Sequence, residues 1–122
     1  MTTARRQIVL IVDDTATMRV LEQAALGPCY DYAEAKNGAE ALEQVARQKP
    51  DLILLDITMP VLDGISTLRA LKQQPETAGI PVIMITTERE LQKRTDCESL
   101  GCADFLQKPV SPAVLRETVR RC

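Results

Sequence analysis

The chain has 122 residues, of which 26% are charged and 45% hydrophobic, a composition typical of one soluble globular domain. Its net charge of -2 offers no basic surface, so we expect no direct binding to nucleic acid or to an anionic membrane. No apolar run approaches the length of a membrane span, and the N-terminal segment lacks the apolar core of a signal peptide. We therefore expect a cytoplasmic protein.

The first third of the chain begins with an apolar run at residues 8–12 (IVLIV), which predicts a fully buried strand. A helix is predicted at residues 15–26, ended by Gly27-Pro28. The inward face of this helix is predicted from three apolar residues at helical spacing, Met18, Leu21 and Ala25. Residues 30–35 are more polar and predict a strand at the edge of the sheet.

The middle of the chain repeats this alternation. A second helix is predicted to start at Asn37, because Glu40 follows three residues later at capping-box spacing, and to end before Pro50. Residues 52–55 predict the third strand. The third helix is predicted to break near Pro75, and its inward face consists of Ile65, Leu68 and Leu71.

The last third adds two strands and two helices. Residues 81–85 (PVIMI) and 103–106 predict the fourth and fifth strands. Between them, residues 88–100 predict a fourth helix, and its thin apolar face, mainly Leu91 and Leu100, indicates marginal packing. The last helix is predicted to begin at Ser111, with Pro112 at its first position, and its inward face consists of Leu115 and Val119.

Five strands alternating with five helices predict an α/β fold, a doubly wound five-stranded parallel sheet covered by helices on both faces. We expect one domain over residues 1–122. Such sheets bind ligands outside the carboxyl ends of their strands, at the point where the strand order reverses. The residues that follow each strand are therefore the first candidates for function.

Acids, a hydroxyl and a lysine follow four of the five predicted strands. Asp13 and Asp14 follow the first strand, Asp56 ends the third, Thr86 follows the fourth and Lys108 follows the fifth. Three carboxylates at one edge repel one another unless a cation joins them, and hard oxygen ligands suit Mg²⁺ or Mn²⁺. Phosphoryl transfer needs a metal and a lysine that neutralise the phosphoryl oxygens, a hydroxyl donor and a carboxylate nucleophile.

Each of these residues also has a purely structural explanation. Asp13 or Asp14 can cap the first helix, and Asp56 can be a turn residue. Thr86 belongs to a residue type common at strand ends, and Lys108 can be an ordinary solvated lysine. The chain has no histidine, and its four cysteines lack metal-binding spacing, which argues against a zinc site. The joint pattern, rather than any single residue, favours function.

Four segments resemble the receiver domain of bacterial response regulators, of the CheY type: IVLIVDD, LILLDITMPVLDG, VIMITTE and ADFLQKPV. The resemblance extends from residue 8 to residue 110 and implies a flavodoxin-like sheet with the strand order 2-1-3-4-5. It implies a phosphoacceptor in two-component or phosphorelay signalling, not a dedicated enzyme. Asp56 would accept the phosphoryl group from a sensor histidine kinase or a phosphotransfer protein.

The resemblance also implies how the metal would be held. Asp14 and Asp56 would bind Mg²⁺, or Mn²⁺, directly, while Asp13 would act largely through a coordinated water. The backbone carbonyl of Thr58 matches the third protein ligand of the family. Thr58 and Glu88 occupy positions that tune dephosphorylation in the family, and the phosphoryl lifetime stays open.

The switching residues are implied in the same way. Lys108 would contact the phosphoryl group, Thr86 would move its hydroxyl onto it, and Phe105 would turn inward as the aromatic switch. The surface of the fourth helix, fifth strand and fifth helix would then change shape for a partner. The resemblance also implies a cis bond between Lys108 and Pro109. Two departures from the family are Thr87 and Phe105. Thr87 stands where the family usually has Ala or Gly, and its extra bulk would slow access for a phosphodonor or an attacking water, while Phe105 stands where Tyr is common.

The partner is less well defined. No DNA-binding segment follows the last helical pattern, so we expect either a single-domain regulator that docks to a protein target or a receiver cut from a larger regulator with its effector domain missing. Both a monomer and a phosphorylation-dependent dimer are compatible with the sequence.

Two other classes of function explain the sequence less well. A phosphohydrolase with an aspartate nucleophile would place a second acid two residues later, and that position is Thr58. A flavin-binding module would have to hold a phosphate beside three acids, and the chain has no Trp to stack on the flavin.

Overall fold

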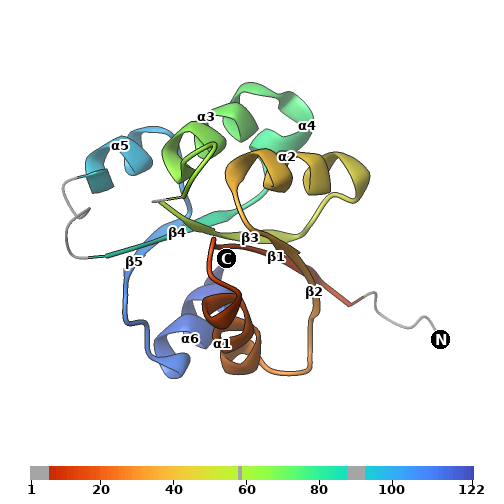
Figure 1. Ribbon diagram of the computed structural model, residues 1–122, viewed down its shortest axis with the longest axis vertical. Coiled ribbons are helices and arrows are strands. Elements are labelled where there is room, and N and C mark those ends of the chain that lie inside the picture. Colours follow the sequence, from red (N-terminus) through yellow and green to blue (C-terminus); the bar gives the residue numbers. More distant parts are fainter. Residues whose placement is uncertain (1–5, 58, 88–92) are drawn as a thin grey trace.

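The computed structural model describes residues 6–57, 59–87 and 93–122 of the chain (Figure 1). A five-stranded parallel sheet has the order β2-β1-β3-β4-β5, which confirms the predicted fold class and strand order. Each strand lies within one residue of its predicted bounds. The strands are β1 (Ile8–Val12), β2 (Asp31–Ala35), β3 (Leu52–Asp56), β4 (Val82–Thr86) and β5 (Asp104–Gln107).

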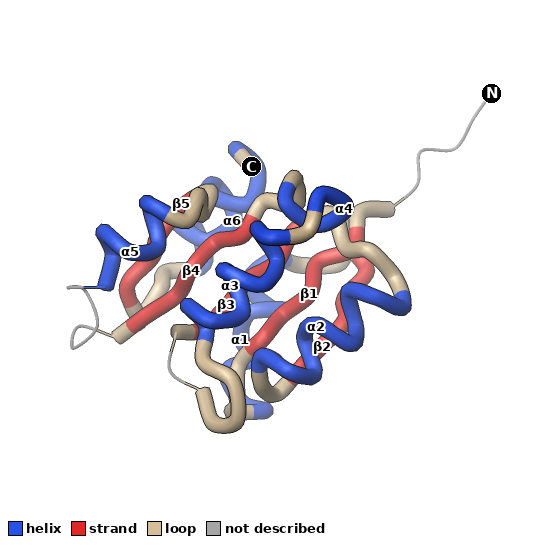
Figure 2. The backbone as a smooth tube through the Cα atoms, turned by 90° about the horizontal axis from the view of Figure 1, so that it is seen from above, coloured by secondary structure: helices blue, strands red, loops and turns tan. Residues whose placement is uncertain are grey.

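Helices cover both faces of the sheet, with α2 to α5 on one side and α1 with α6 on the other (Figure 1). Seen from above, α2, α3 and α5 lie across the strands (Figure 2). The helices are α1 (Ala16–Leu26), α2 (Gly38–Arg47), α3 (Gly64–Gln73), α4 (Pro75–Ala78), α5 (Arg94–Ser99) and α6 (Pro112–Arg121). The described residues thus contain six helices, one more than predicted, because Pro75 both ends α3 and starts the short helix α4.

The predicted helix starts are confirmed by their capping bonds. The Asn37 side chain accepts a hydrogen bond from the backbone N–H of Glu40, at 2.8 Å. The Glu40 carboxylate reaches back to the N–H of Lys36, at 3.3 Å, instead of the N–H of Asn37 that a full capping box uses. Ser111 caps α6 by accepting from the N–H of Val114, at 3.1 Å. These caps fix where the helices leave the carboxyl edge of the sheet.

Successive residues of the strands alternate between two apolar cores. Leu10, Leu55 and Met84 belong to the core beneath α2, α3 and α5. Their neighbours in the same strands, Ile11, Leu54 and Ile85, belong to the core beneath α1 and α6. The same alternation, continued past the strand ends, assigns the side chains at the carboxyl edge to one face or the other.

The inward face of α1 differs from the prediction. The buried residues of this helix are Glu22 and Leu26, whereas Leu21 is 55% exposed and Met18 and Ala25 are half-buried. Packing against α6 and the sheet turns the helix so that residues 18, 22 and 26, four apart, line up on its inner side. The residue that faces inward is therefore the acid Glu22 and not Leu21, which the apolar pattern predicts.

The described part of the predicted fourth helix is α5. Leu91 lies outside the described residues, and Leu100 is half-buried at the end of the helix. The main inward contact of α5 is instead Cys97, which is fully buried in the core and which the prediction overlooked. None of the described helices combines the length and apolar character that a membrane span requires.

Candidate functional site

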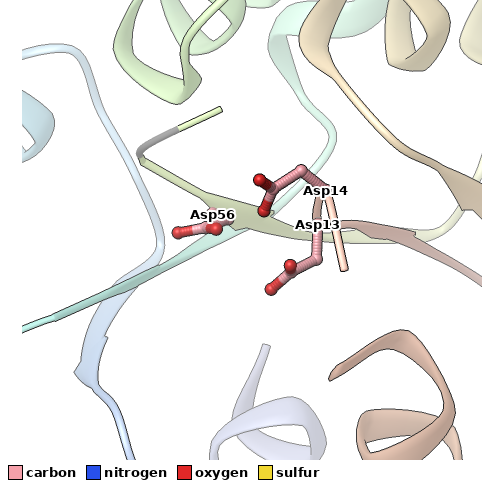
Figure 3. A group of neighbouring side chains, drawn as sticks. All are labelled: Asp13, Asp14 and Asp56. Carbon is pink, nitrogen blue, oxygen red and sulfur yellow. The ribbon is translucent and has the colours of Figure 1, made fainter. Parts of the chain in front are cut away.

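The predicted acids meet at the carboxyl ends of β1 and β3, which lie side by side in the centre of the sheet. Val12 pairs with Leu55, so the next residues along the two strands, Asp13 and Asp56, are neighbours. One carboxylate oxygen from each of Asp13, Asp14 and Asp56 lies within 4.8 Å of the other two (Figure 3). Asp13 and Asp56 are buried, at 1% and 5% exposure, while Asp14 is exposed.

Asp13 is held by three hydrogen-bond donors. Its Oδ1 accepts from the N–H and the hydroxyl of Thr15, at 2.9 and 2.8 Å, and its Oδ2 accepts from Lys108 Nζ, at 3.0 Å. Burial alone would raise the pKa of Asp13, but the bonds from Thr15 and Lys108 outweigh it and leave the pKa lowered. Asp13 is therefore kept ionised at neutral pH.

Asp56 has a different environment. Among the described residues, only Lys108 donates to its carboxylate, with Nζ 3.4 Å from Oδ2. Burial raises the pKa of Asp56 to about 6, opposed by Lys108 and reinforced by the charge of Asp13. Asp56 is thus largely a carboxylate at neutral pH, poorly solvated and with one weak donor among the described residues, an environment that suits a reactive oxygen nucleophile.

Lys108 joins the two buried acids from the far side of β4. It follows β5, and its backbone N–H donates to the carbonyl of Thr86, at 2.6 Å. The peptide bond from Lys108 to Pro109 is cis, as predicted. Burial would lower the pKa of Lys108, but its hydrogen bond to Asp13 and the charge of Asp56 raise it, so the side chain is an ammonium ion.

The residues present fit a hard divalent cation. Three carboxylates supply oxygen ligands from two adjacent strand ends, and their negative charge exceeds that of the single ammonium beside them. This donor set suits Mg²⁺ or Mn²⁺ better than zinc or copper, which prefer nitrogen and sulfur. The predicted carbonyl ligand, Thr58, lies outside the described residues.

The two predicted switch residues lie on the opposite face from the buried acids. The alternation of β4 places Thr86 on the same face as Val82 and Met84, and Phe105 packs in that same core. Thr86 is fully buried, and its hydroxyl donates to the carbonyl of Thr87, at 3.2 Å, not to the acids. In this structure the hydroxyl and the acidic cluster are therefore not joined.

Phe105 is already inside the molecule. Its ring is 7% exposed, and the guanidinium carbon of Arg94 lies 5.7 Å from the ring centroid. The predicted inward turn of this ring would therefore start from a buried position, and a smaller rearrangement against α5 would suffice. Thr87 is exposed beside the site, and Glu88 lies outside the described residues.

One residue near the site was missed by the sequence analysis. Glu22 on α1 is 7% exposed, and burial raises its pKa to about 8, helped by the negative charges of Asp13 and Asp56 and opposed by Lys108. It lines a cavity of about 260 Å³ between α1 and α6, which Lys108 also lines. The spacing of Met18, Glu22 and Leu26 was a signal that could have placed this acid inside.

Comparison with known proteins gives the site its context. A family model described as the response regulator receiver domain matches residues 9–120. Response regulator PleD of Caulobacter vibrioides is 40% identical over 113 residues, covering 92% of this chain and 25% of PleD. Protein PilH of Pseudomonas aeruginosa is 35% identical over 112 residues, covering 91% of this chain and 93% of PilH.

Solved structures of response regulators also match this chain. The chemotaxis response regulator CheY4 of Vibrio cholerae matches with a TM-score of 0.88 at 30% identity, covering 96% of this chain and 98% of that one. Several sequence relatives are much longer, since the chain spans 25% of PleD and 48% of the regulatory protein PhoB of Pseudomonas aeruginosa.

Proposed function

The chain belongs to the response regulator receiver domain family, and from that premise we propose that it accepts a phosphoryl group on Asp56 in a magnesium-dependent step of two-component or phosphorelay signalling. One observation carries the proposal: a buried carboxylate stands at a strand end with two further carboxylates within 4.8 Å and a lysine ammonium 3.4 Å away. This arrangement combines a nucleophile, a cation site and a counter-charge for a phosphoryl group.

The chemistry proceeds at Asp56. A carboxylate oxygen attacks the phosphorus of a phosphohistidine on a sensor histidine kinase or a phosphotransfer protein. The new O–P bond forms as the N–P bond breaks, and the histidine nitrogen keeps the electron pair. The pKa of about 6 supports this role, because Asp56 is ionised at neutral pH yet carries little stabilisation that the reaction would have to remove.

The other polar residues of the site have separate tasks. Asp14 and Asp56 would hold Mg²⁺ directly, Asp13 would act largely through a coordinated water, and the Thr58 carbonyl would be the further ligand. When bound, the metal neutralises negative charge on the carboxylates and on the phosphoryl oxygens. Lys108 places its ammonium against the phosphoryl group, a role supported by its position 3.4 Å from the Asp56 carboxylate.

Phosphorylation then changes a surface. The Thr86 hydroxyl leaves the Thr87 carbonyl for the phosphoryl group, and Phe105 repacks in the core that it shares with Thr86. The surface of α5, β5 and α6 adjusts because Phe105 lies on β5 and is covered by Arg94 at the start of α5. This surface is where a protein target or an effector domain would bind.

Intact-mass analysis after incubation with Mg²⁺ and a small acyl phosphate tests the function. We expect one phosphoryl adduct on the wild-type chain, no adduct on Asp56→Asn, and none in the presence of EDTA. Asp63→Asn is the matched control, because Asp63 is an exposed acid that caps α3 shortly after Asp56, and it should keep the adduct. A wild-type chain without any adduct, or an adduct that persists in Asp56→Asn, would refute the proposal.

A further inference from the structure

The Lys108 ammonium is bound to two of the carboxylates that form the candidate metal site. Its Nζ is 3.0 Å from Asp13 and 3.4 Å from Asp56, two of the three carboxylates that form the candidate metal site. A divalent cation among these carboxylates repels a neighbouring ammonium and competes for the same oxygens. The ammonium therefore needs another acceptor, or metal binding must overcome the loss of both ion pairs.

A second acceptor lies beneath the site. Glu22 is 7% exposed, and its carboxyl group makes no hydrogen bond or ion pair with the residues that the structure describes. No fully buried polar side-chain atom among those residues lacks a partner, so the Glu22 oxygens keep some contact with solvent. A largely buried acid that reaches water but no cation can accept an ammonium that enters its cavity. Burial raises the pKa of Glu22 to about 8, so the group is largely a neutral carboxylic acid at neutral pH and ionises more readily when a cation approaches.

The space between the two groups is open. Glu22 and Lys108 line the same cavity of about 260 Å³, whose other walls are mainly apolar and come from α1, α6 and the segment after Lys108. The alternation of β1 and β3 places Asp13 and Asp56 on the same face of the sheet as α1. A lysine has a flexible four-carbon stem, which can lie along apolar walls while its ammonium changes partner.

We propose that Glu22 is a positioning residue for Lys108: when a divalent cation binds the acidic cluster, the Lys108 ammonium shifts through the cavity to the Glu22 carboxyl group, which releases its proton to solvent, and the ammonium returns to Asp56 when the phosphoryl group arrives. The proposal rests on the proposed function, because it assumes that the acidic cluster binds a metal. It accounts for two features of this chain together, an acid inside the molecule that has no ion-pair partner among the described residues and the cavity that this acid shares with the lysine.

A double-mutant cycle on Mg²⁺ affinity, measured by calorimetry, tests this coupling. We expect Glu22→Gln to weaken Mg²⁺ binding roughly fivefold in the wild-type background, because the displaced ammonium loses its second acceptor. In the Lys108→Met background the same substitution should leave the affinity unchanged. Glu117→Gln, which removes an exposed acid from α6, should have no effect in either background.

The outcomes separate the possible roles of Glu22. An equal loss in both backgrounds would mean that Glu22 attracts the metal by its charge alone, and it would overturn the proposal. No loss in either background would overturn it as well. If the wild-type chain bound no Mg²⁺, the proposed function would fail together with this inference, whereas normal Mg²⁺ binding and phosphorylation without coupling would remove only the inference.

A structure of the wild-type chain with Mg²⁺ bound gives a readout that does not depend on any variant. We expect Lys108 Nζ to lie within about 4 Å of a Glu22 carboxylate oxygen. An ammonium that stays between Asp13 and Asp56 with the metal in place would overturn the proposal, even if the Lys108→Met variants did not fold.

Discussion

The ends of β1 and β3 carry two aspartates that look alike in sequence and differ in chemistry. Asp13 and Asp56 are both buried, lie side by side and share the Lys108 ammonium. Asp13 has two further donors from Thr15 and a lowered pKa, whereas Asp56 has no further donor among the described residues and a pKa of about 6. Hydrogen bonding, rather than burial, therefore accounts for the opposite pKa shifts of the two acids.

The backbones that follow the two acids produce this difference. After Asp13 the chain turns directly into α1, which brings Thr15 back onto the carboxylate. After Asp56 the chain makes a longer loop that is closed by Gly64, whose N–H donates to the carbonyl of Ile57, at 2.8 Å. A Cβ at Gly64 would lie 2.1 Å from the carbonyl oxygen of Asp56, so this loop packs against the strand end without room for a side chain.

Gly64→Ala should have the largest effect, because it disturbs the strand end that carries Asp56. The added methyl group must push the α3 start away from the Asp56 backbone, and we expect the free energy of unfolding to fall by about 3 kcal/mol. Urea denaturation measures the loss. Gly79→Ala is the control, since a Cβ there meets nothing within 4 Å, and equal stability of the two variants would contradict the close packing described for Gly64.

Asp56→Asn should stabilise the folded chain. The folded-state pKa of Asp56, about 6, lies above its usual 3.8, so its ionisation costs stability at higher pH. We expect the free energy of unfolding to rise by about 2 kcal/mol at about pH 8 and this gain to shrink as the pH falls from about 6 to about 4. Urea denaturation across this pH range tests it.

Asp13→Asn is the matched variant, and it should change the free energy of unfolding in the opposite direction. The folded-state pKa of Asp13 is lowered, so its charge contributes stability above the usual value of 3.8, and that contribution is lost as the pH falls through the folded-state value. Asp13→Asn should therefore destabilise the chain at about pH 8. A gain from Asp56→Asn that stayed constant with pH, or a gain from Asp13→Asn, would contradict the assignment of the two acids.

Thr15→Ala should have the smallest effect and should make Asp13 more similar to Asp56. The substitution removes the hydroxyl donor at 2.8 Å but keeps the N–H donor. We expect the pKa of Asp13 to rise and the free energy of unfolding to fall by about 1 kcal/mol. A carboxyl NMR titration measures the pKa, with Thr17→Ala, an exposed position on the same helix, as the control. An unchanged Asp13 would mean that the hydroxyl contributes nothing.

The strands and the acidic cluster could be predicted because both follow from local pattern and a topological rule. Buried parallel strands are short apolar runs, and the polar residue that ends each run must lie at the carboxyl edge. The pairing of β1 with β3 then brings Asp13 to Asp56. The cap residues Asn37 and Ser111 were equally visible, because a cap depends only on neighbours along the chain.

Residues that depend on tertiary packing were harder to place. Leu21 and Glu22 are adjacent in sequence, and apolar periodicity favours Leu21 as the inward residue. The rotation of α1 against α6 decides otherwise, and it favours the competing spacing of Met18, Glu22 and Leu26, which a count of apolar residues ranks lower because it contains an acid. The burial of Phe105 is similar, because the space for its ring is set by α5 and not by the residues of β5.

The position of Lys108 late in the sequence also determines when the site can form during synthesis and folding. Lys108 is separated by 95 residues from Asp13 and by 52 residues from Asp56. Contacts of such length close late, since the chain must pay the entropy of the intervening loops before they form. A growing chain on the ribosome therefore carries its acids long before it carries their counter-ion. The complete set of groups is assembled only after β5 has docked, so the proposed phosphoryl acceptance would require the whole sheet to be synthesised and folded.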